Sequence, residues 1–218
     1  MQPKFIKILI FSLILIFFGL SITYKIPLPA AEDLARQIKN GEMIVHGDFC
    51  PITKNVYSYT EPEQSFANHH WLSGVFFYLM HGAVGFGGMV VFKVILMLLT
   101  FGLLFFVASK KSDFFLVAFF SIPTLLILMS RSALRPELFS YFFIVIFLYL
   151  LTDLKEHPQH KRVFWLIPLQ LLWANMHLFF GVGIMLVGGF LLEKIILDYK
   201  NLKNNLVIKK LAIILMAL

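Results

Sequence analysis

The chain has 218 residues, of which 59% are hydrophobic and only 14% are charged. Because soluble domains carry about 25% charged residues, this composition indicates a membrane protein, and the single cysteine excludes an internal disulfide framework. The formal net charge of +7 comes largely from lysines at the ends of apolar runs, as membrane topology requires, so we expect a lipid bilayer as a partner and no nucleic acid.

The first apolar run, residues 8–24, follows Lys4 and Lys7. It is longer than the core of about 7–15 residues in a signal peptide, and no small-x-small cleavage site follows it closely. We therefore interpret this run as a retained first span. The lysines that precede it place the amino terminus in the cytoplasm.

A polar segment, residues 25–70, separates the first span from the rest of the chain. It contains six acidic and four basic side chains and should therefore face the outside of the cell. Residues 31–40 predict a short amphipathic helix that ends at Gly41 and presents Asp33 to water at the membrane interface. Residues 71–84 are too short for a span and predict a second interfacial helix, closed by a glycine-rich stretch.

The remainder of the chain predicts spans of alternating direction, at residues 89–108, 114–129, 138–151, 163–175, 178–192 and 208–218. The last span is incomplete, so we expect an amino-terminal fragment of a longer protein. The predicted fold is a single all-α domain over residues 1–218. It is a polytopic transmembrane helix bundle with a long first extracytoplasmic loop that bears interfacial helices.

This topology places three separated polar clusters on the same outer face. They are the long loop, the segment Arg135-Pro136-Glu137, and Asn175 with His177 at the tip of a helical hairpin. The charge count alone does not require this coincidence. Ionisable residues gathered at one face of a membrane protein indicate a functional site.

Asp33 and Glu137 are the candidate catalytic carboxylates. Glycosyl transfer from a lipid phosphate needs a base near the acceptor hydroxyl and positive charge near the leaving phosphate. Asp33 can act as the base, Glu137 can orient the acceptor or hold a metal, and Arg135 or Arg131 can bind the phosphate. The alternative interpretation is structural: Asp33 lies on a solvated helix face, and Glu137 stabilises the first turn of its helix.

The aromatic and imidazole side chains near these carboxylates are candidates for substrate binding. A sugar or its phosphate could contact His69, His70 and Trp71 in the loop, and Trp173, Asn175 and His177 at the hairpin, with Trp173 stacking on a sugar ring. The alternative is an interfacial aromatic belt without further function. Lys93, inside a predicted span, either extends its amine outward to the headgroups or binds the phosphate of the lipid carrier.

Five motifs resemble a group of predicted bacterial membrane proteins identified with the GT-C superfamily of glycosyltransferases. The group is similar to protein mannosyltransferases, oligosaccharyltransferases and aminoarabinose transferases. The resemblance covers about residues 8–192 and is carried by Glu32-Asp33-Leu34 through Asn40-Gly41-Glu42, Tyr57-Ser58-Tyr59-Thr60, Asn68-His69-His70-Trp71-Leu72, Arg135-Pro136-Glu137 and Trp173-Ala174-Asn175-Met176-His177.

The resemblance implies an enzyme of the bacterial inner (cytoplasmic) membrane that modifies the cell envelope. Its donor would be a polyprenyl-phosphate-linked sugar, and its acceptor a glycan, a lipid or a protein. Asp33 matches the catalytic aspartate after the first span, and Glu137 matches a second acidic motif. Some members use a divalent metal, Mg²⁺ or Mn²⁺. Gln37 stands where the group commonly has a histidine, which argues against a metal ligand at that position.

Two non-enzymatic interpretations remain beside the glycosyltransferase. A transporter or flippase would line a path through the bilayer with polar groups near its midplane, whereas the polar clusters of this chain gather at one face. A non-catalytic assembly protein would use the loop as a docking surface for an extracytoplasmic partner. The position of the polar clusters favours the enzyme over the transporter.

Overall fold

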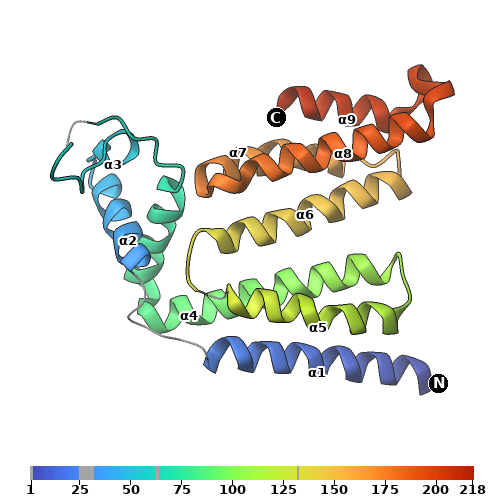
Figure 1. Cartoon of the computed structure of the whole chain (residues 1–218), viewed down its shortest axis with the longest axis horizontal. Coiled ribbons are helices and arrows are strands. Elements are labelled where there is room, and N and C mark those ends of the chain that lie inside the picture. Colours follow the sequence, from blue (N-terminus) through green and yellow to red (C-terminus); the bar gives the residue numbers. More distant parts are fainter. Residues whose placement is uncertain (1, 25–31, 62–63, 132) are drawn as a thin grey trace.

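The computed structural model describes residues 2–24, 32–61, 64–131 and 133–218, and within these ranges the protein is all-α, as the sequence predicts (Figure 1). The described α-helices are α1 (Gln2–Tyr24), α2 (Glu32–Val45), α3 (Cys50–Thr53), α4 (Trp71–Ser109), α5 (Phe114–Ser130), α6 (Glu137–Glu156), α7 (Leu166–Met176), α8 (Gly181–Leu197) and α9 (Leu206–Ala217). Three short 3₁₀ helices, η1 (Arg162–Trp165), η2 (Leu178–Phe180) and η3 (Tyr199–Asn204), connect the later elements.

Four helical segments in the described residues are long and apolar enough to cross a membrane. They are Lys4–Thr23 in α1, the whole of α4, the whole of α6, and Leu178–Leu197 over η2 and α8. Helix α5 is apolar but has 17 residues, and α7 and α9 are shorter still. Large apolar side chains remain exposed along the bundle, for example Phe17 on α1 and Phe119 on α5, which suits contact with lipid.

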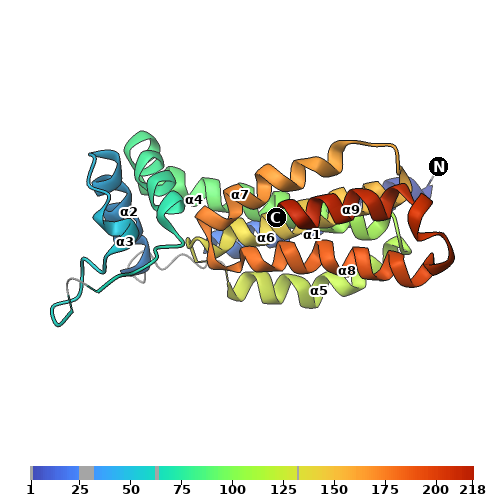
Figure 2. The same cartoon turned by 90° about the horizontal axis from the view of Figure 1, so that it is seen from above.

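The helices form a bundle with a cap across one end. In Figures 1 and 2, α1, α5, α6, α7, α8, α9 and the second part of α4 run alongside one another, while α2, α3 and the first part of α4 lie across them. We call the capped end the α2 end. The end that carries the amino terminus and the turn between α6 and η1 is the opposite end.

Helix α4 changes direction at Gly85. This residue has φ 63° and ψ −174°, a conformation that is essentially restricted to glycine. The first part of α4 therefore lies across the bundle, and the second part runs along it (Figure 1). The sequence predicts a break in the glycine-rich stretch, and the structure assigns it to this residue.

Helix α2 packs on the first part of α4, and the two backbones touch. A Cβ atom at Gly41 would overlap the carbonyl of Gly74, so close packing requires glycine there. The prediction that α2 ends at Gly41 is wrong, because Gly41 lies inside the helix at this crossing. The helix ends instead at Val45, and Gly47 (φ 91°) follows it in a Schellman arrangement, in which the Asp48 N–H donates to the Met43 carbonyl over 2.9 Å.

Aromatic side chains fill the core between the spans. The Phe76 ring packs edge-on against Phe139 of α6 with centroids 5.3 Å apart, and Phe18 of α1 meets Phe101 of α4 at 5.6 Å. These contacts tie α1 and α6 to the two parts of α4. The cap is thereby held against the bundle.

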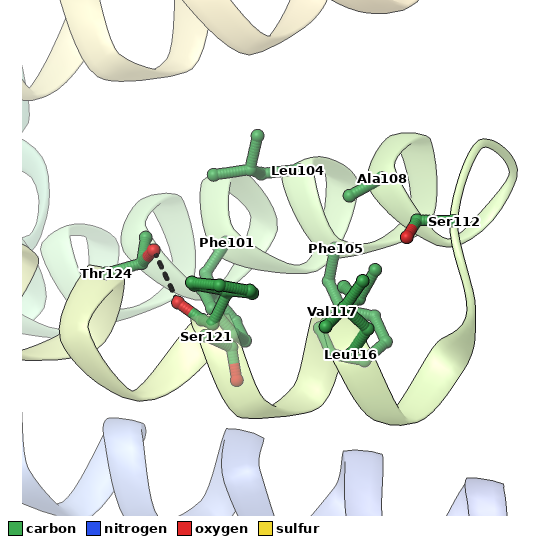
Figure 3. Close-up of a pocket in the computed structure, with 10 residues that line it drawn as sticks. Phe101, Leu104, Phe105, Ala108, Ser112, Leu116, Val117, Ser121 and Thr124 are labelled. Atoms are coloured by element: carbon green, nitrogen blue, oxygen red, sulfur yellow. Dashed lines mark hydrogen bonds between the residues drawn. The ribbon is translucent and has the colours of Figure 1, made fainter.

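An apolar pocket of about 250 Å³ opens between the second part of α4 and α5 (Figure 3). Phe101 and Phe105 line it from α4, and Leu116 and Val117 from α5. Its polar side chains are hydroxyls, and those of Ser121 and Thr124 bond to carbonyls of their own helix. No charged group lines this pocket, so we place the candidate chemistry elsewhere.

Candidate functional site

Asp33 lies in the first turn of α2 between two guanidinium groups. Its Oδ1 is 3.3 Å from Nη2 of Arg36, and its Oδ2 is 3.3 Å from Nη2 of Arg135. All three side chains are about half exposed. Exposed ion pairs of this kind contribute about 0–1 kcal/mol each, so a charged ligand can displace them at little cost. The Arg135 contact joins the long loop to the segment before α6.

Glu137 begins α6 and is partly buried. A carboxylate in the first turn of a helix is stabilised by the helix dipole, as the structural interpretation of this residue states. Among the described residues, the ion pair between the loop and this segment is made by Arg135 and not by Glu137. Arg131, at the end of α5, is exposed.

The histidine segment before α4 contacts the tip of the hairpin between α7 and η2. The rings of His70 and His177 stack with centroids 5.2 Å apart and an interplanar angle of 22°. Beside them, the Trp71 indole N–H donates to Oδ1 of Asn175 over 2.8 Å. The structure therefore brings the loop and the hairpin together through side chains that the sequence singles out.

A buried hydrogen-bond relay supports His177 from below. The Trp173 indole N–H donates to Oγ of Ser140 over 2.7 Å, and Oγ of Ser140 lies 2.7 Å from Nδ1 of His177. A hydroxyl that accepts from an indole has its own proton free to donate, so Nδ1 of His177 is the acceptor. This assigns the proton of the neutral ring to Nε2.

Burial lowers the pKa of both imidazoles of the stack. Burial, together with the smaller effect of the neighbouring His70 ring, lowers the pKa of His177 to about 4. Burial also lowers the pKa of His70, with smaller effects in the same direction from His69 and Arg36. The Met176 carbonyl and the Asp33 carboxylate act on His70 in the opposite direction. The electrostatic influence of Arg36 and Asp33 shows that the arginine cluster and the histidine stack are neighbours.

Two predicted binding residues lie away from any exposed surface. Trp173 is fully buried, and its ring packs between Phe143 and Phe147 of α6. The prediction that it stacks on a sugar is therefore corrected, because its faces are covered by phenylalanine rings. Lys93 is only 3% exposed inside α4.

His69, next to the stack, is exposed. It takes no part in the stack of His70 and His177, because adjacent residues at a helix start point in different directions.

The polar face of α2 divides into exposed and buried halves. Asp33 and Arg36 are half exposed, whereas Gln37 and Asn40 are buried. The Tyr57 hydroxyl donates to Oδ1 of Asn40 over 2.7 Å, and Oε1 of Gln37 has no hydrogen-bond partner among the described residues. Arg36, Gln37, Asn40 and Tyr57 help to line a small cavity of about 120 Å³ under the loop, and Asp33 lies outside it. Helical spacing groups the four α2 residues but cannot show which of them are covered.

Ser140 is a supporting residue that the sequence does not reveal. It is a single hydroxyl within the apolar run of α6, and such residues usually bond to their own helix. Its fully buried position between Trp173 and His177 depends on how α7 packs on α6. In the sequence, Ser140 is marked only as a single serine within an apolar run, which does not indicate a contact with His177.

Groups that could ligate a metal occur at the opposite end of the molecule. Within the described residues, three side chains that could together hold a metal ion are Asp153, His157 and His160. That group does not include Asp33 or Glu137. The described residues at the α2 end thus give no support to an Mg²⁺ or Mn²⁺ site there.

Comparison with known proteins gives no match. No protein-family model, no curated protein and no solved structure matches this chain. The architecture itself is plain: a helical protein with several helices long and apolar enough to cross a membrane.

Proposed function

We propose that the α2 end binds a polyprenyl-phosphate-linked sugar and transfers that sugar to an acceptor outside the bacterial inner membrane. The observation that carries this proposal is the half-exposed Asp33 carboxylate between Arg36 and Arg135. The GT-C resemblance adds that an aspartate at this position is catalytic. In this proposal the α2 end is extracytoplasmic and the amino terminus is cytoplasmic.

The position of the arginines suits a ligand that has an apolar tail and an anionic head. The apolar helices form the part of the molecule that could cross a membrane, and α2 lies across their end (Figure 1). A phosphate that arrives with its lipid tail in the bilayer would meet the guanidinium groups at the level of the headgroups. Guanidinium groups can bind phosphate through two parallel, charge-assisted hydrogen bonds, whereas each exposed pair with Asp33 is a single contact of 3.3 Å.

Binding of the phosphate would release Asp33 for proton transfer. The acceptor oxygen attacks the anomeric carbon, the bond from that carbon to the phosphate oxygen breaks, and its electron pair stays on the phosphate. The acceptor proton passes to the Asp33 carboxylate. Arg36 and Arg135 stabilise the charge that develops on the leaving phosphate. Among the described residues, the group of three possible metal ligands lies at the opposite end, so no step is assigned to a metal.

The histidine stack would act as a neutral, polar wall of the same site. With the proton of His177 on Nε2, the ring offers a donor, while Nδ1 of His70 is buried with no hydrogen-bond partner among the described residues. A sugar hydroxyl can accept a hydrogen bond from Nε2 of His177, which is the less buried of these two groups. Glu137, at the start of α6, is placed in this proposal to orient the acceptor.

The test uses the gene in its own host. Lipid-linked sugars and surface glycans are measured by mass spectrometry in a deletion strain that carries the wild-type gene, Asp33→Asn or Glu61→Gln. We expect Asp33→Asn to lower transfer by at least about 100-fold, because it removes the general base, at unchanged membrane expression. Glu61→Gln removes an exposed carboxylate of the same loop and should leave transfer intact.

Transfer that persists in Asp33→Asn would remove this residue from the mechanism. If glycans and lipid-linked sugars are the same with and without the gene, the enzyme proposal fails, and a transport or docking role takes its place. In that case Asp33→Asn should also be tested for loss of an assembly partner in the membrane.

A further inference from the structure

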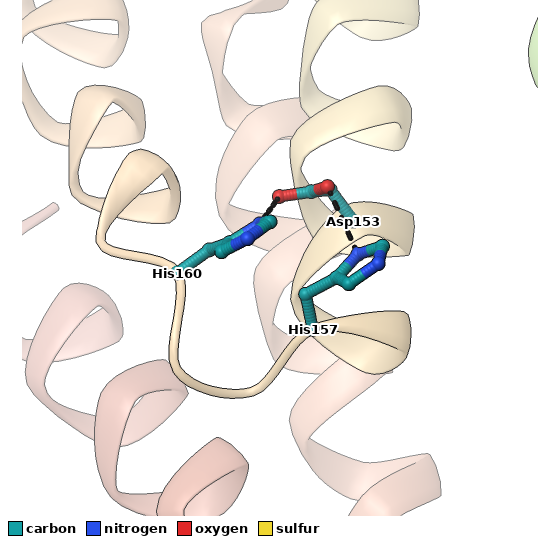
Figure 4. A group of neighbouring side chains, drawn as sticks. All are labelled: Asp153, His157 and His160. Atoms are coloured by element: carbon teal, nitrogen blue, oxygen red, sulfur yellow. Dashed lines mark hydrogen bonds and ion pairs between the residues drawn. The ribbon is translucent and has the colours of Figure 1, made fainter.

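A second cluster of titratable side chains lies at the opposite end, where α6 ends (Figure 4). Nδ1 of His160 is 3.0 Å from Oδ2 of Asp153, and Nδ1 of His157 is 3.3 Å from Oδ1 of the same carboxylate. The two imidazole rings stack with centroids 4.6 Å apart. One ligand atom from each of the three residues lies within 4.8 Å of the other two.

The backbone that carries these side chains is fixed by hydrogen bonds. The His157 N–H donates to the Asp153 carbonyl over 2.7 Å, and the His160 N–H donates to the His157 carbonyl over 3.0 Å. From α9, the buried Lys210 amine donates to the carbonyls of Pro158 and His160, each over 2.7 Å. The turn is thus held against both α6 and α9, and the three side chains start from defined positions.

The donor set has a definite chemical preference. Two imidazole nitrogens and one carboxylate are ligands that zinc binds in proteins, usually with water completing four-coordination. Imidazole favours late first-row divalent metals, whereas Mg²⁺ and Ca²⁺ prefer oxygen ligands alone. The side chain of Asp153 is only 12% exposed, so a cation there would bind a carboxylate that is shielded from water.

We propose that Asp153, His157 and His160 bind one zinc ion, through one carboxylate oxygen and the two Nδ1 atoms. Zinc bonds of about 2.0–2.2 Å place tetrahedral ligand atoms about 3.3–3.6 Å apart. The three ligand atoms lie within 4.8 Å of one another, so they must move closer together when zinc binds. A metal lies in the plane of each imidazole that binds it, and these rings are nearly parallel at 15°. One ring must therefore rotate. His157 rotates, because it follows the end of α6 and is the more exposed ring, at 53% against 41% for His160.

The zinc ion would join the end of α6 to the turn that α9 holds. Its binding energy would be added to the stability of this end of the bundle, because a ligand that binds the folded state alone stabilises it. The site lies at the other end of the molecule from Asp33. It therefore does not depend on the proposed glycosyl transfer.

The test uses the purified chain in detergent, without a polyhistidine tag and after treatment with a chelator. Zinc is titrated by calorimetry, and Co²⁺ is used as a spectroscopic probe of the ligand geometry. We expect one zinc ion per chain and a tetrahedral Co²⁺ absorption band. Asp153→Asn, His157→Ala and His160→Ala should each weaken zinc binding at least about tenfold, because even loss of a group that supports a ligand costs about 10–100-fold.

A matched control is His46→Ala, which removes a histidine on the other side of the molecule and should leave zinc affinity unchanged. His160→Gln retains a hydrogen-bonding side chain of similar size and replaces His160→Ala if that variant does not elute as a folded protein in size-exclusion chromatography. Absence of saturable zinc binding in the wild type contradicts the proposal. Equal zinc affinity in the cluster variants and His46→Ala contradicts it as well.

Discussion

Polar residues that are close in the sequence have very different surroundings in this protein, and the surroundings decide what each can do. Asp33 and Gln37 are one helical turn apart on α2, yet Asp33 is half exposed between arginines while Gln37 is buried against α4. His69 and His70 are adjacent, but only His70 enters the stack. Asp33 and the arginines beside it are therefore open to solvent, whereas Gln37 is not.

The low pKa of His177 makes stability depend on pH. The ring titrates at a pKa of about 4 in the folded protein and 6.5 in the unfolded chain, so between these values the unfolded chain binds more protons. The stability that depends on the neutral His177 ring is complete above pH 6.5 and is lost as the pH falls toward 4. Its slope is on the order of 1 kcal/mol per pH unit.

Thermal unfolding in detergent at several pH values between 4 and 7 tests this effect. We expect His177→Asn to flatten the rise of the melting temperature with pH, and His69→Asn, at an exposed ring, to retain it. An unchanged pH profile in His177→Asn would mean that other groups cause the dependence.

At the scale of elements, two glycines determine how the cap is built. Gly85 provides the turn within α4, and Gly41 allows the backbone of α2 to approach that of α4 at Gly74. The first part of α4 is thereby directed across the bundle, where it carries α2 and positions Asp33 beside Arg135. The candidate site is therefore a product of helix geometry and not of the loop alone.

Gly85→Ala should destabilise the protein, whereas Gly82→Ala should not. At Gly85 a side chain would be strained by about 1–3 kcal/mol, because φ is +63°. Gly82 is helical, and a Cβ there meets no atom within 4 Å, so alanine should stabilise by roughly 0.5–1 kcal/mol. Melting temperatures of both variants in detergent provide the comparison. Equal temperatures would mean that α4 can straighten through position 85 without cost.

At the scale of the whole molecule, polar clusters lie at both ends of an apolar bundle. The α2 end carries the arginines and the histidine stack, and the opposite end carries Asp153 with His157 and His160. The apolar helices between them are long enough to separate two aqueous compartments. The two clusters would then serve different sides of the membrane.

Thiol labelling of intact cells tests this arrangement. In a Cys50→Ser background, we introduce Tyr59→Cys, at a fully exposed position of the α2 end, or Gln159→Cys, in the turn at the opposite end. A membrane-impermeant maleimide should label position 59 in intact cells and position 159 only after the membrane is opened. The reverse pattern would invert the proposed orientation, and labelling of both positions in intact cells would contradict a bundle that spans the membrane.

The sequence by itself determined the helical class, the approximate helix ranges and the polar segments at the ends of the spans. Apolar runs and charged flanks suffice for this, because a bilayer imposes a minimum length and polarity on each segment. The sequence also pointed to Asp33, Arg135, His70 and His177, since ionisable residues beside apolar runs are uncommon.

Only the tertiary structure decided which of these residues meet, because contacts between distant segments depend on packing and not on local pattern. It placed Asp33 against Arg135 and buried Trp173, and it moved the end of α2 from Gly41 to Val45. Asp153, His157 and His160 are close in the sequence, where they mark only the polar end of a span. Their convergence on one carboxylate follows from the turn that α9 holds in place.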